Sequence, residues 1–176
     1  MKIIILGPPG TGKGTQAKII AKEFKLQHIS TGQIFRTEFE KKSKLGLEGQ
    51  KYWGSGNLVP DEITIGLVKN NLPSNNFILD GFPRNVKQAQ KLSKMTKIDY
   101  VLNIQSDKDI IIKRLLGRAK LEGRKDDTPE VIENRFKVYE KETKPLLEFY
   151  KKEIANIDGN GRPEDIFRNV KKILKK

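Results

Sequence analysis

The chain has 176 residues, 36% hydrophobic and 32% charged, and its 35 Lys and Arg against 22 Asp and Glu give a formal net charge of +13. A chain of this length buries about 70% of the surface that its unfolded form exposes, so one compact domain needs no disulfide, and the absence of cysteine excludes thiolate zinc sites and a cysteine nucleophile. The first apolar run, Ile3–Leu6, is too short for a signal peptide, and no later run approaches the roughly 18 residues of a membrane span, so we expect a soluble, cytoplasmic protein without membrane contact.

Short apolar runs alternate with longer amphipathic segments along the chain, a pattern typical of βαβ units and a mostly parallel sheet. The expected strands are Ile3–Leu6, Gln27–Ile29, Phe77–Leu79, Tyr100–Ile104 and Ile154–Ile157. Helices are expected to begin at Lys13, Val86, Asp107 and Pro163. These elements predict an α/β fold around a five-stranded sheet.

Two insertions interrupt this alternation. The first, roughly residues 30–72, carries three helical patterns with a stop and restart at Leu58–Asp61. The second is the loop 122–127, and the Thr128–Pro129 pair behind it suits the N-cap and first turn of a long helix. We therefore expect one core domain built from residues 1–29 and 73–176, a helical insertion at 30–59 that connects by helix to about 72, and a short loop at 118–128.

The segment Gly7–Thr15 follows the first expected strand and opens the first expected helix. Its G-x-x-x-x-G-K spacing in that context indicates a P-loop, in which backbone N–H groups turn toward an anion and Lys13 supplies a mobile charge for the outer phosphates. An ordinary Gly-Pro turn would explain neither the lysine nor the flanking elements. Gly14 stands where a P-loop usually has Ser or Thr, with Thr15 one residue later, so direct magnesium ligation by that hydroxyl is not expected.

A second group, Asp80–Arg84, directly follows the third expected strand. Strand ends in parallel α/β sheets are where ligands bind. Asp80 can orient magnesium-bound water, and Arg84 can hold a phosphate by two parallel hydrogen bonds. Taken alone, the segment is equally well explained as a capped turn with an exposed arginine.

With these segments in view, the chain resembles the adenylate kinases, a P-loop family that moves a phosphoryl group between ATP and AMP. The resemblance covers nearly the whole length and rests on seven segments in order: Gly7–Thr15; Ile29–Gly32 with Arg36; Leu58–Glu62; Asp80–Arg84 with Gln88; Arg114–Arg118; Arg124–Asp127 with Arg135; and Asp158–Gly159. It implies a three-layer P-loop fold in which 30–59 is the nucleoside-monophosphate-binding insertion and 118–128 is a short lid without zinc.

The resemblance also implies roles for individual residues. ATP binding falls to Gly10, Thr11, Gly12, Lys13, Gly14, Thr15, Arg114, Arg118 and Arg162. AMP binding falls to Thr31, Gly32, Arg36, Asn57, Leu58, Val59, Gly81, Phe82, Pro83, Arg84, Gln88, Arg124 and Arg135. The catalytic set is Lys13, Arg84, Arg118, Arg124 and Arg135, and Asp80 binds magnesium through water. Arg162 aligns with a segment whose backbone touches the ATP adenine in similar proteins, and six of the other seven arginines fall at positions that the family uses for phosphates or bases. ATP shared by Arg114 and Arg118 would relieve their like-charge repulsion on one helix.

The identity of the monophosphate that accepts the phosphoryl group depends on fewer residues. The Gln88 amide presents a donor and an acceptor that match an adenine edge, whereas related pyrimidine-monophosphate kinases tend to carry Asn there, so Gln88 favours AMP. A plain polar residue on a helix is the other reading of Gln88. Gln33 stands where the family usually has Asp. We expect His28 to be structural, and Tyr52 and Trp53 to belong to the core of the insertion.

The expected reaction is Mg-dependent transfer of the terminal phosphoryl group of ATP to AMP, giving two ADP, by a monomer. No general base is needed, because the second pKa of the AMP phosphate is near ~6 and the group is already ionised at neutral pH. Two alternatives stay open: a UMP/CMP-type kinase, and a P-loop protein that binds nucleic acid through its charge of +13. No aromatic-and-basic surface motif supports specific nucleic-acid binding.

Overall fold

The computed structural model describes residues 1–124 and 126–175, without the side chain of Glu122, so Lys125 of the expected lid lies outside the described residues. One sheet of five strands has the order β2-β3-β1-β4-β5 and is parallel at every described pairing. The strands are β1 Lys2–Leu6, β2 Gln27–Ser30, β3 Phe77–Asp80, β4 Tyr100–Gln105 and β5 Ile154–Asp158. Every predicted strand is confirmed, each extended by one residue.

The helices follow the expected rhythm. They are α1 Lys13–Phe24, α2 Thr31–Glu40, α3 Lys44–Trp53, α4 Asp61–Asn71, α5 Val86–Ser93, α6 Lys108–Glu122, α7 Pro129–Val138, α8 Pro145–Phe149 and α9 Pro163–Leu174, with a π-helical turn, η1, at Tyr139–Thr143. The starts at Lys13, Val86 and Pro163 are confirmed, and so are three helices in the first insertion. Asp107 is the N-cap of α6, which begins one residue later than predicted.

Helices cover both faces of the sheet. Successive strand residues point to opposite faces, so one strand contributes to two buried clusters. Ile3 and Ile5 of β1 belong to a buried cluster with residues of α1 and α9. Ile4 and Leu6 belong to a second cluster, with residues of α4, α5 and α8. Each of these buried aliphatic side chains contributes roughly 1.5–3 kcal/mol, which explains the unbroken apolar run of β1.

Side-chain caps fix where several helices begin. Ser30, Ser43, Asn85 and Thr128 each accept a backbone N–H from the first turn of the following helix. The predicted Thr128–Pro129 start is confirmed. The long helix expected behind it changes geometry at η1, where the Lys144 N–H donates to the carbonyl of Tyr139 at 2.8 Å just before Pro145, which has no N–H to donate.

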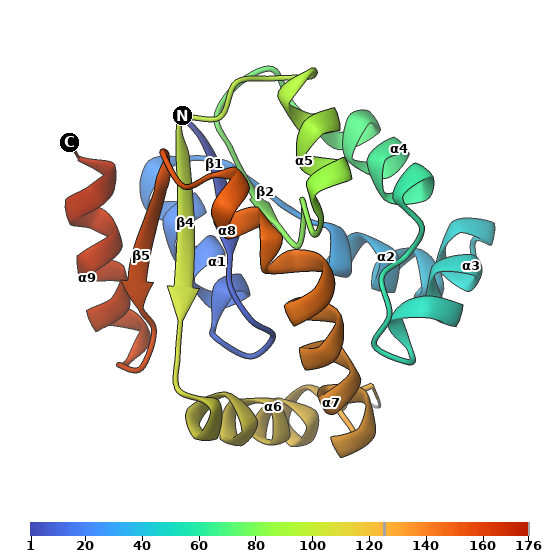
Figure 1. Ribbon diagram of the computed structural model, residues 1–176. Helices are drawn as coiled ribbons and strands as arrows, with labels where there is room; N and C mark the ends of the chain where they lie inside the picture. Colours follow the sequence, from blue (N-terminus) through green and yellow to red (C-terminus); the bar gives the residue numbers. More distant parts are fainter. Residues whose placement is uncertain (125, 176) are drawn as a thin grey trace.

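The carboxyl ends of the strands lie at the edge of the sheet beside α6 and α7, and the insertion α2–α3 flanks the same edge (Figure 1). Residues from β1, β2, β3, α2, α3, α6 and α7 line one cavity. Across residues 1–124 and 126–175, none of the helices is both long and apolar enough to span a bilayer.

Candidate active site

A cavity of about 1010 Å³ lies at the carboxyl ends of the strands. Its wall combines the P-loop, α2, the 56–59 segment, the end of β3 and parts of α6 and α7. The lining includes most of the expected nucleotide residues: Gly10, Gly12, Lys13, Gly14, Thr15, Thr31, Gly32, Arg36, Asn57, Leu58, Val59, Asp80, Gly81, Pro83, Arg84, Gln88, Arg114, Arg118, Arg124 and Arg135. Segments far apart in the chain therefore meet here.

The P-loop adopts a conformation that its glycines permit. Gly7 has φ 136° and packs so closely that a Cβ would lie 2.2 Å from the carbonyl oxygen of Ile104, while Gly12, with φ 92°, caps the N-terminus of α1. The Lys13 Nζ donates to the carbonyl oxygens of Gly7 at 2.8 Å and Pro8 at 2.6 Å. Its charge thus lies inside the loop that is suited to surround phosphate.

Burial, with a smaller contribution from the positive charges of Arg84 and Arg118, lowers the pKa of Lys13 to about 8, although Asp80 opposes the shift. An anion bound in the loop would favour the protonated amine. Binding of phosphate in the loop and protonation of the Lys13 amine are therefore linked.

Asp80, at the end of β3, lies within this charge cluster. Its Oδ2 is 3.4 Å from the Nε2 of His28. Burial alone would raise the pKa of Asp80, but the contact with His28 and the charges of Lys13 and Arg84 outweigh it and lower that pKa. We expected a structural role for His28. The structure shows that His28 lines the cavity and contacts Asp80.

The residues present fit a magnesium ion that is bound chiefly by phosphate oxygens and water. Among the described residues, no group of three or more His, Asp or Glu side chains is placed to hold a metal by itself. The Oδ2 of Asp80 would lie 3.4 Å from a Cβ at Gly14, so the carboxylate occupies the neighbourhood that a Ser or Thr side chain at that position would reach. A carboxylate beside the P-loop suits Mg²⁺, which proteins usually bind through one or two carboxylates, several waters and the phosphates of the substrate.

The backbone carbonyl groups of the segment after β3 accept hydrogen bonds from side chains, which hold the segment in place. Thr31 Oγ1 and Arg84 Nε each donate to the carbonyl of Gly81 at 3.0 Å, and Thr143 Oγ1 donates to the carbonyl of Arg84 at 2.8 Å. Three elements, α2, η1 and the end of β3, therefore position Arg84 at the cavity.

Gln88 lines the cavity but is only 1% exposed, and its amide is partly occupied by the protein. Its Nε2 donates to Asp61 Oδ1 at 2.8 Å, and its Oε1 accepts the backbone N–H of Arg84 at 2.8 Å. One N–H and one oxygen lone pair stay available to a base.

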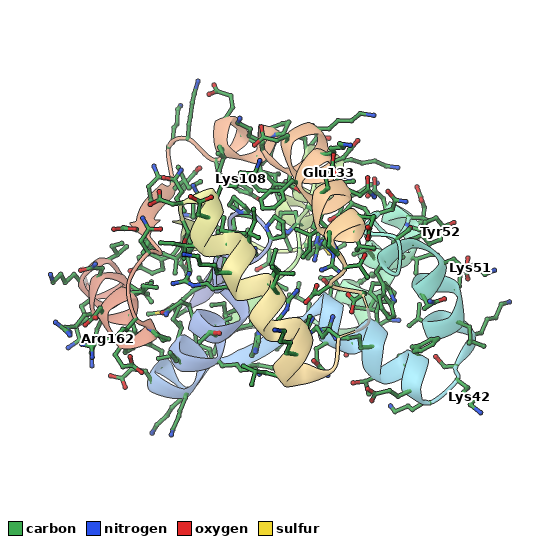
Figure 2. The ribbon with its side chains drawn as sticks, turned by 90° about the horizontal axis from the view of Figure 1, so that it is seen from below. Lys42, Lys51, Tyr52, Lys108, Glu133 and Arg162 are labelled. Atoms are coloured by element: carbon green, nitrogen blue, oxygen red, sulfur yellow. The ribbon has the colours of Figure 1, made fainter. Side chains whose placement is uncertain are left out.

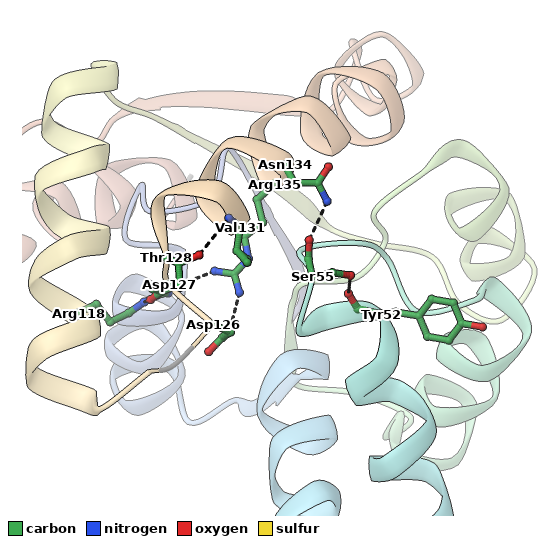
Figure 3. Close-up of polar contacts among 9 residues, drawn as sticks. All are labelled: Tyr52, Ser55, Arg118, Asp126, Asp127, Thr128, Val131, Asn134 and Arg135. Carbon is green, nitrogen blue, oxygen red and sulfur yellow. Dashed lines mark hydrogen bonds and ion pairs between the residues drawn. The ribbon is translucent and has the colours of Figure 1, made fainter.

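Arg118 of α6 and Arg135 of α7 share one carboxylate (Figure 3). Asp127, whose side chain is fully buried, accepts from Arg118 Nε at 2.7 Å and Nη2 at 2.8 Å, and it also pairs with Arg135. Asp126 pairs with Arg135 as well. Burial alone would raise the pKa of Asp127, but the two arginines lower it.

We expected ATP to relieve the repulsion between Arg114 and Arg118, and the structure shows that each of them also has partners within the protein. Asp127 neutralises Arg118 in the structure. Arg114 instead donates to three carbonyl oxygens, those of Thr11 at 3.4 Å, Gly159 at 2.8 Å and Gly161 at 3.0 Å. The two arginines therefore have different partners within the protein, and the role of ATP at this pair stays a prediction.

The remaining expected residues divide into two groups. Arg36 and Arg124 line the cavity, and Arg36 Nη2 lies 3.4 Å from Gln33 Oε1. Three others are outside the lining. Thr11 and Phe82 are fully buried, with Thr11 Oγ1 donating to the Pro8 carbonyl at 3.0 Å, and Arg162 is 80% exposed and pairs with Asp165. Figure 2 shows Arg162 at the periphery, as it does Lys42 and Lys51.

Sequence reasoning missed the polar partners that organise the arginines and the insertion. Asn134 Nδ2 donates to the Ser55 carbonyl at 2.8 Å and to Asn57 Oδ1 at 3.0 Å, which ties the 55–57 loop to α7 (Figure 3). The sequence analysis named Asp126 and Asp127 only as part of the Arg124–Asp127 segment and not as partners of the arginines. For Asn134 the sequence carries no signal.

Phosphate is the group that a P-loop and clustered arginines are equipped to bind, and about 1010 Å³ lies at the upper end of the ~300–1,000 Å³ typical of small-molecule pockets. Fold and site together define an α/β P-loop protein of the nucleotide-phosphotransferase class. The family model for adenylate kinase matches residues 5–155. The chain belongs to the adenylate kinase family.

Relatives support this membership over nearly the full chain. An adenylate kinase of Rhodococcus erythropolis (strain PR4) is 45% identical over 175 aligned residues, covering 94% of each protein. An adenylate kinase of Clostridium botulinum (strain Hall) is 41% identical over 212 aligned positions, covering 99% of this chain and 98% of that protein, and one from Clostridium kluyveri (strain ATCC 8527) is 42% identical with the same coverage. Because those alignments are longer than this chain of 176 residues, the clostridial proteins are the longer ones.

Proposed function

We propose that the protein catalyses the reversible transfer of the terminal phosphoryl group of ATP to AMP, giving two ADP. The observation that carries the proposal is a single cavity lined by both the P-loop and the Asp80–Gln88 segment, with arginines from three helices around it. The family match and the names of the relatives favour this reaction over pyrimidine-monophosphate phosphorylation and over nucleic-acid binding.

In this reaction an oxygen of the AMP phosphate attacks the terminal phosphorus of ATP, and the bond to the bridging oxygen breaks to release ADP. The attacking group is already ionised at neutral pH, so the protein has to align it and stabilise the charge of a loose, in-line transition state. Lys13, Arg84, Arg118, Arg124 and Arg135 are the side chains that we assign to this task. A magnesium ion, placed by Asp80 through water, would neutralise charge on the donor phosphates.

We assign residues 30–59 to AMP binding and 118–128 to a short lid. The tie between Asn134 and the 55–57 loop supports a functional link between the insertion and α7, which follows the lid. The similar aligned length of the Rhodococcus relative supports a short-lid form. Closure over the nucleotides would exclude water, which otherwise competes with AMP for the phosphoryl group. Action as a cytoplasmic monomer is also a prediction of ours.

A coupled assay of ADP formation from ATP tests the proposal across AMP, UMP, CMP and GMP. We expect AMP to be the preferred acceptor and Lys13→Met to lower the rate about 10²-fold or more, because it removes a preorganised charge from the phosphates. Equal use of UMP or CMP would favour the pyrimidine-specific alternative. Steeply salt-dependent RNA or DNA binding without phosphoryl transfer would contradict the proposed activity.

A further inference from the structure

Gln88 has an amide whose two ends are chemically different but similar in shape, so its orientation must be fixed by its neighbours. The backbone N–H of Arg84 can only donate, and it lies 2.8 Å from Gln88 Oε1. The Asp61 carboxylate can only accept when ionised, and its Oδ1 lies 2.8 Å from Gln88 Nε2. Only one orientation of the amide satisfies both neighbours.

Asp61 is itself held in place at the first turn of α4, opposite α5. The Asn85 Nδ2 donates to the same Oδ1 at 2.9 Å, and Lys87 Nζ lies 3.5 Å from Oδ2. The side chain is 16% exposed. Partial burial would raise the pKa of Asp61, but the hydrogen bonds from Asn85 and Gln88 and the charge of Lys87 outweigh it, so the group stays an ionised acceptor.

The orientation of this amide decides which base it can read. With its oxygen lying toward Arg84 and its nitrogen toward Asp61, Gln88 has one lone pair and one N–H left at fixed positions. Position 6 of adenine carries an N–H donor, whereas position 6 of a 6-oxopurine such as hypoxanthine carries an acceptor. The two purines have nearly the same shape, so the arrangement of hydrogen-bond donors and acceptors is what distinguishes them. An amide in the opposite orientation would suit the 6-oxopurine.

We propose that Asp61 is a positioning residue that fixes the amide of Gln88 and thereby makes the acceptor site select 6-aminopurine over 6-oxopurine monophosphates. The inference rests on the proposed function, in which Gln88 contacts the acceptor base. Asp61 acts through Gln88 and is not among the residues that line the cavity of about 1010 Å³.

The test compares kcat/KM for AMP and for IMP, with ATP as donor, in the full-length chain. Asp61→Leu keeps the approximate size of the side chain but removes the acceptor, and we expect the AMP:IMP ratio to fall about tenfold, chiefly through KM for AMP, because a buried N–H loses its partner. Asp61→Asn is the conservative rescue, since an amide oxygen can still accept from Gln88 and Asn85, and it should keep the wild-type ratio. KM for ATP should be unchanged in both variants.

Two further variants separate positioning from general structural damage. Glu62→Gln removes the neighbouring carboxylate, which pairs with Lys87 and not with Gln88, and should leave the ratio unchanged. In a Gln88→Ala background, Asp61→Leu should have no further effect on the ratio. An unchanged ratio in Asp61→Leu, an equal loss in Asp61→Asn, or a full effect without Gln88 would each overturn the inference. Failure of the unaltered protein to phosphorylate AMP would instead overturn the proposed function along with it.

Discussion

Lys13 carries its positive charge in surroundings that disfavour it. Burial lowers its pKa from 10.5 to about 8, so between these two values the unfolded chain binds more protons than the folded protein. The contribution of Lys13 to the free energy of unfolding therefore rises with pH across that interval. Phosphate in the loop would reverse the balance, because it favours the charged amine.

We therefore expect ATP binding to take up a proton at about pH 8.5, when Lys13 in the free protein has partly lost its own. Calorimetric titration of Mg-ATP in two buffers of different ionisation enthalpy measures this uptake. The uptake should disappear at about pH 6.5, where Lys13 is already charged, which provides the control. Equal apparent enthalpies in the two buffers at the higher pH would contradict the role given to Lys13.

The individual residues that the sequence identified are those with a local signature. The spacing of Gly7, Gly12 and Lys13 was enough to predict the P-loop, since the chemistry and the backbone requirement lie within one short segment. The partners of Gln88 were not predictable in this way. Asp61 is 27 positions away, and nothing in either local sequence states that a carboxylate will meet that amide.

At the scale of elements, the structure joins α6 to α7 through buried charge. Asp127 lies in the connection and binds Arg118 from one helix and Arg135 from the other. The carboxylate stabilises this junction above its unfolded pKa of 3.8, and the contribution is lost as the pH falls through the lowered folded pKa.

We expect Asp127→Ala to reduce the free energy of unfolding by about 3 kcal/mol, because it leaves two partly buried arginines without their common partner. Urea denaturation measures the loss. Glu133→Ala on α7 is the matched control: its partner Lys137 is 72% exposed, and such a surface pair contributes about 0–1 kcal/mol. Tripolyphosphate should stabilise Asp127→Ala more than the unaltered protein, since the anion no longer competes with a carboxylate. Equal losses in the two variants would show that the junction does not depend on Asp127.

The elements themselves were largely predictable. Every strand of the sheet was located to within one residue, and the signal was strongest for β1, β3 and β4, which are short, largely apolar runs. The π-helical turn at Tyr139–Thr143 was missed, since the amphipathic pattern continues through it and only Pro145 marks the change. Thr128 and Pro129 were sufficient to locate the start of α7.

At the scale of the whole molecule, the chain carries a net charge of +13, and its cavity is lined by arginines and Lys13. Both proposed substrates are anions, so the summed field should speed their encounter with the protein. Salt screens such a field over a Debye length of about 10 Å at 0.1 M ionic strength.

We expect kcat/KM for AMP to fall as ionic strength rises from about 0.02 to 0.3 M, with a smaller change in kcat, because screening acts on encounter more than on the bound complex. Initial rates at several potassium chloride concentrations measure both parameters. Sucrose at matched osmolality is the control for non-ionic effects of the solute. A kcat/KM that is independent of salt would show that the surplus of lysine serves purposes other than attracting substrate.

The topology also places the first strand's start and the last helix's end on the side of the sheet away from the proposed nucleotide site. β1 begins at Lys2 and α9 ends at Leu174, both at the edge of the sheet opposite α6 and α7 (Figure 1). A fluorescent label or a tether to a solid support, attached near either of these positions, would project away from the nucleotide entrance. Immobilised preparations coupled there should consequently turn over substrate as freely as the protein in solution.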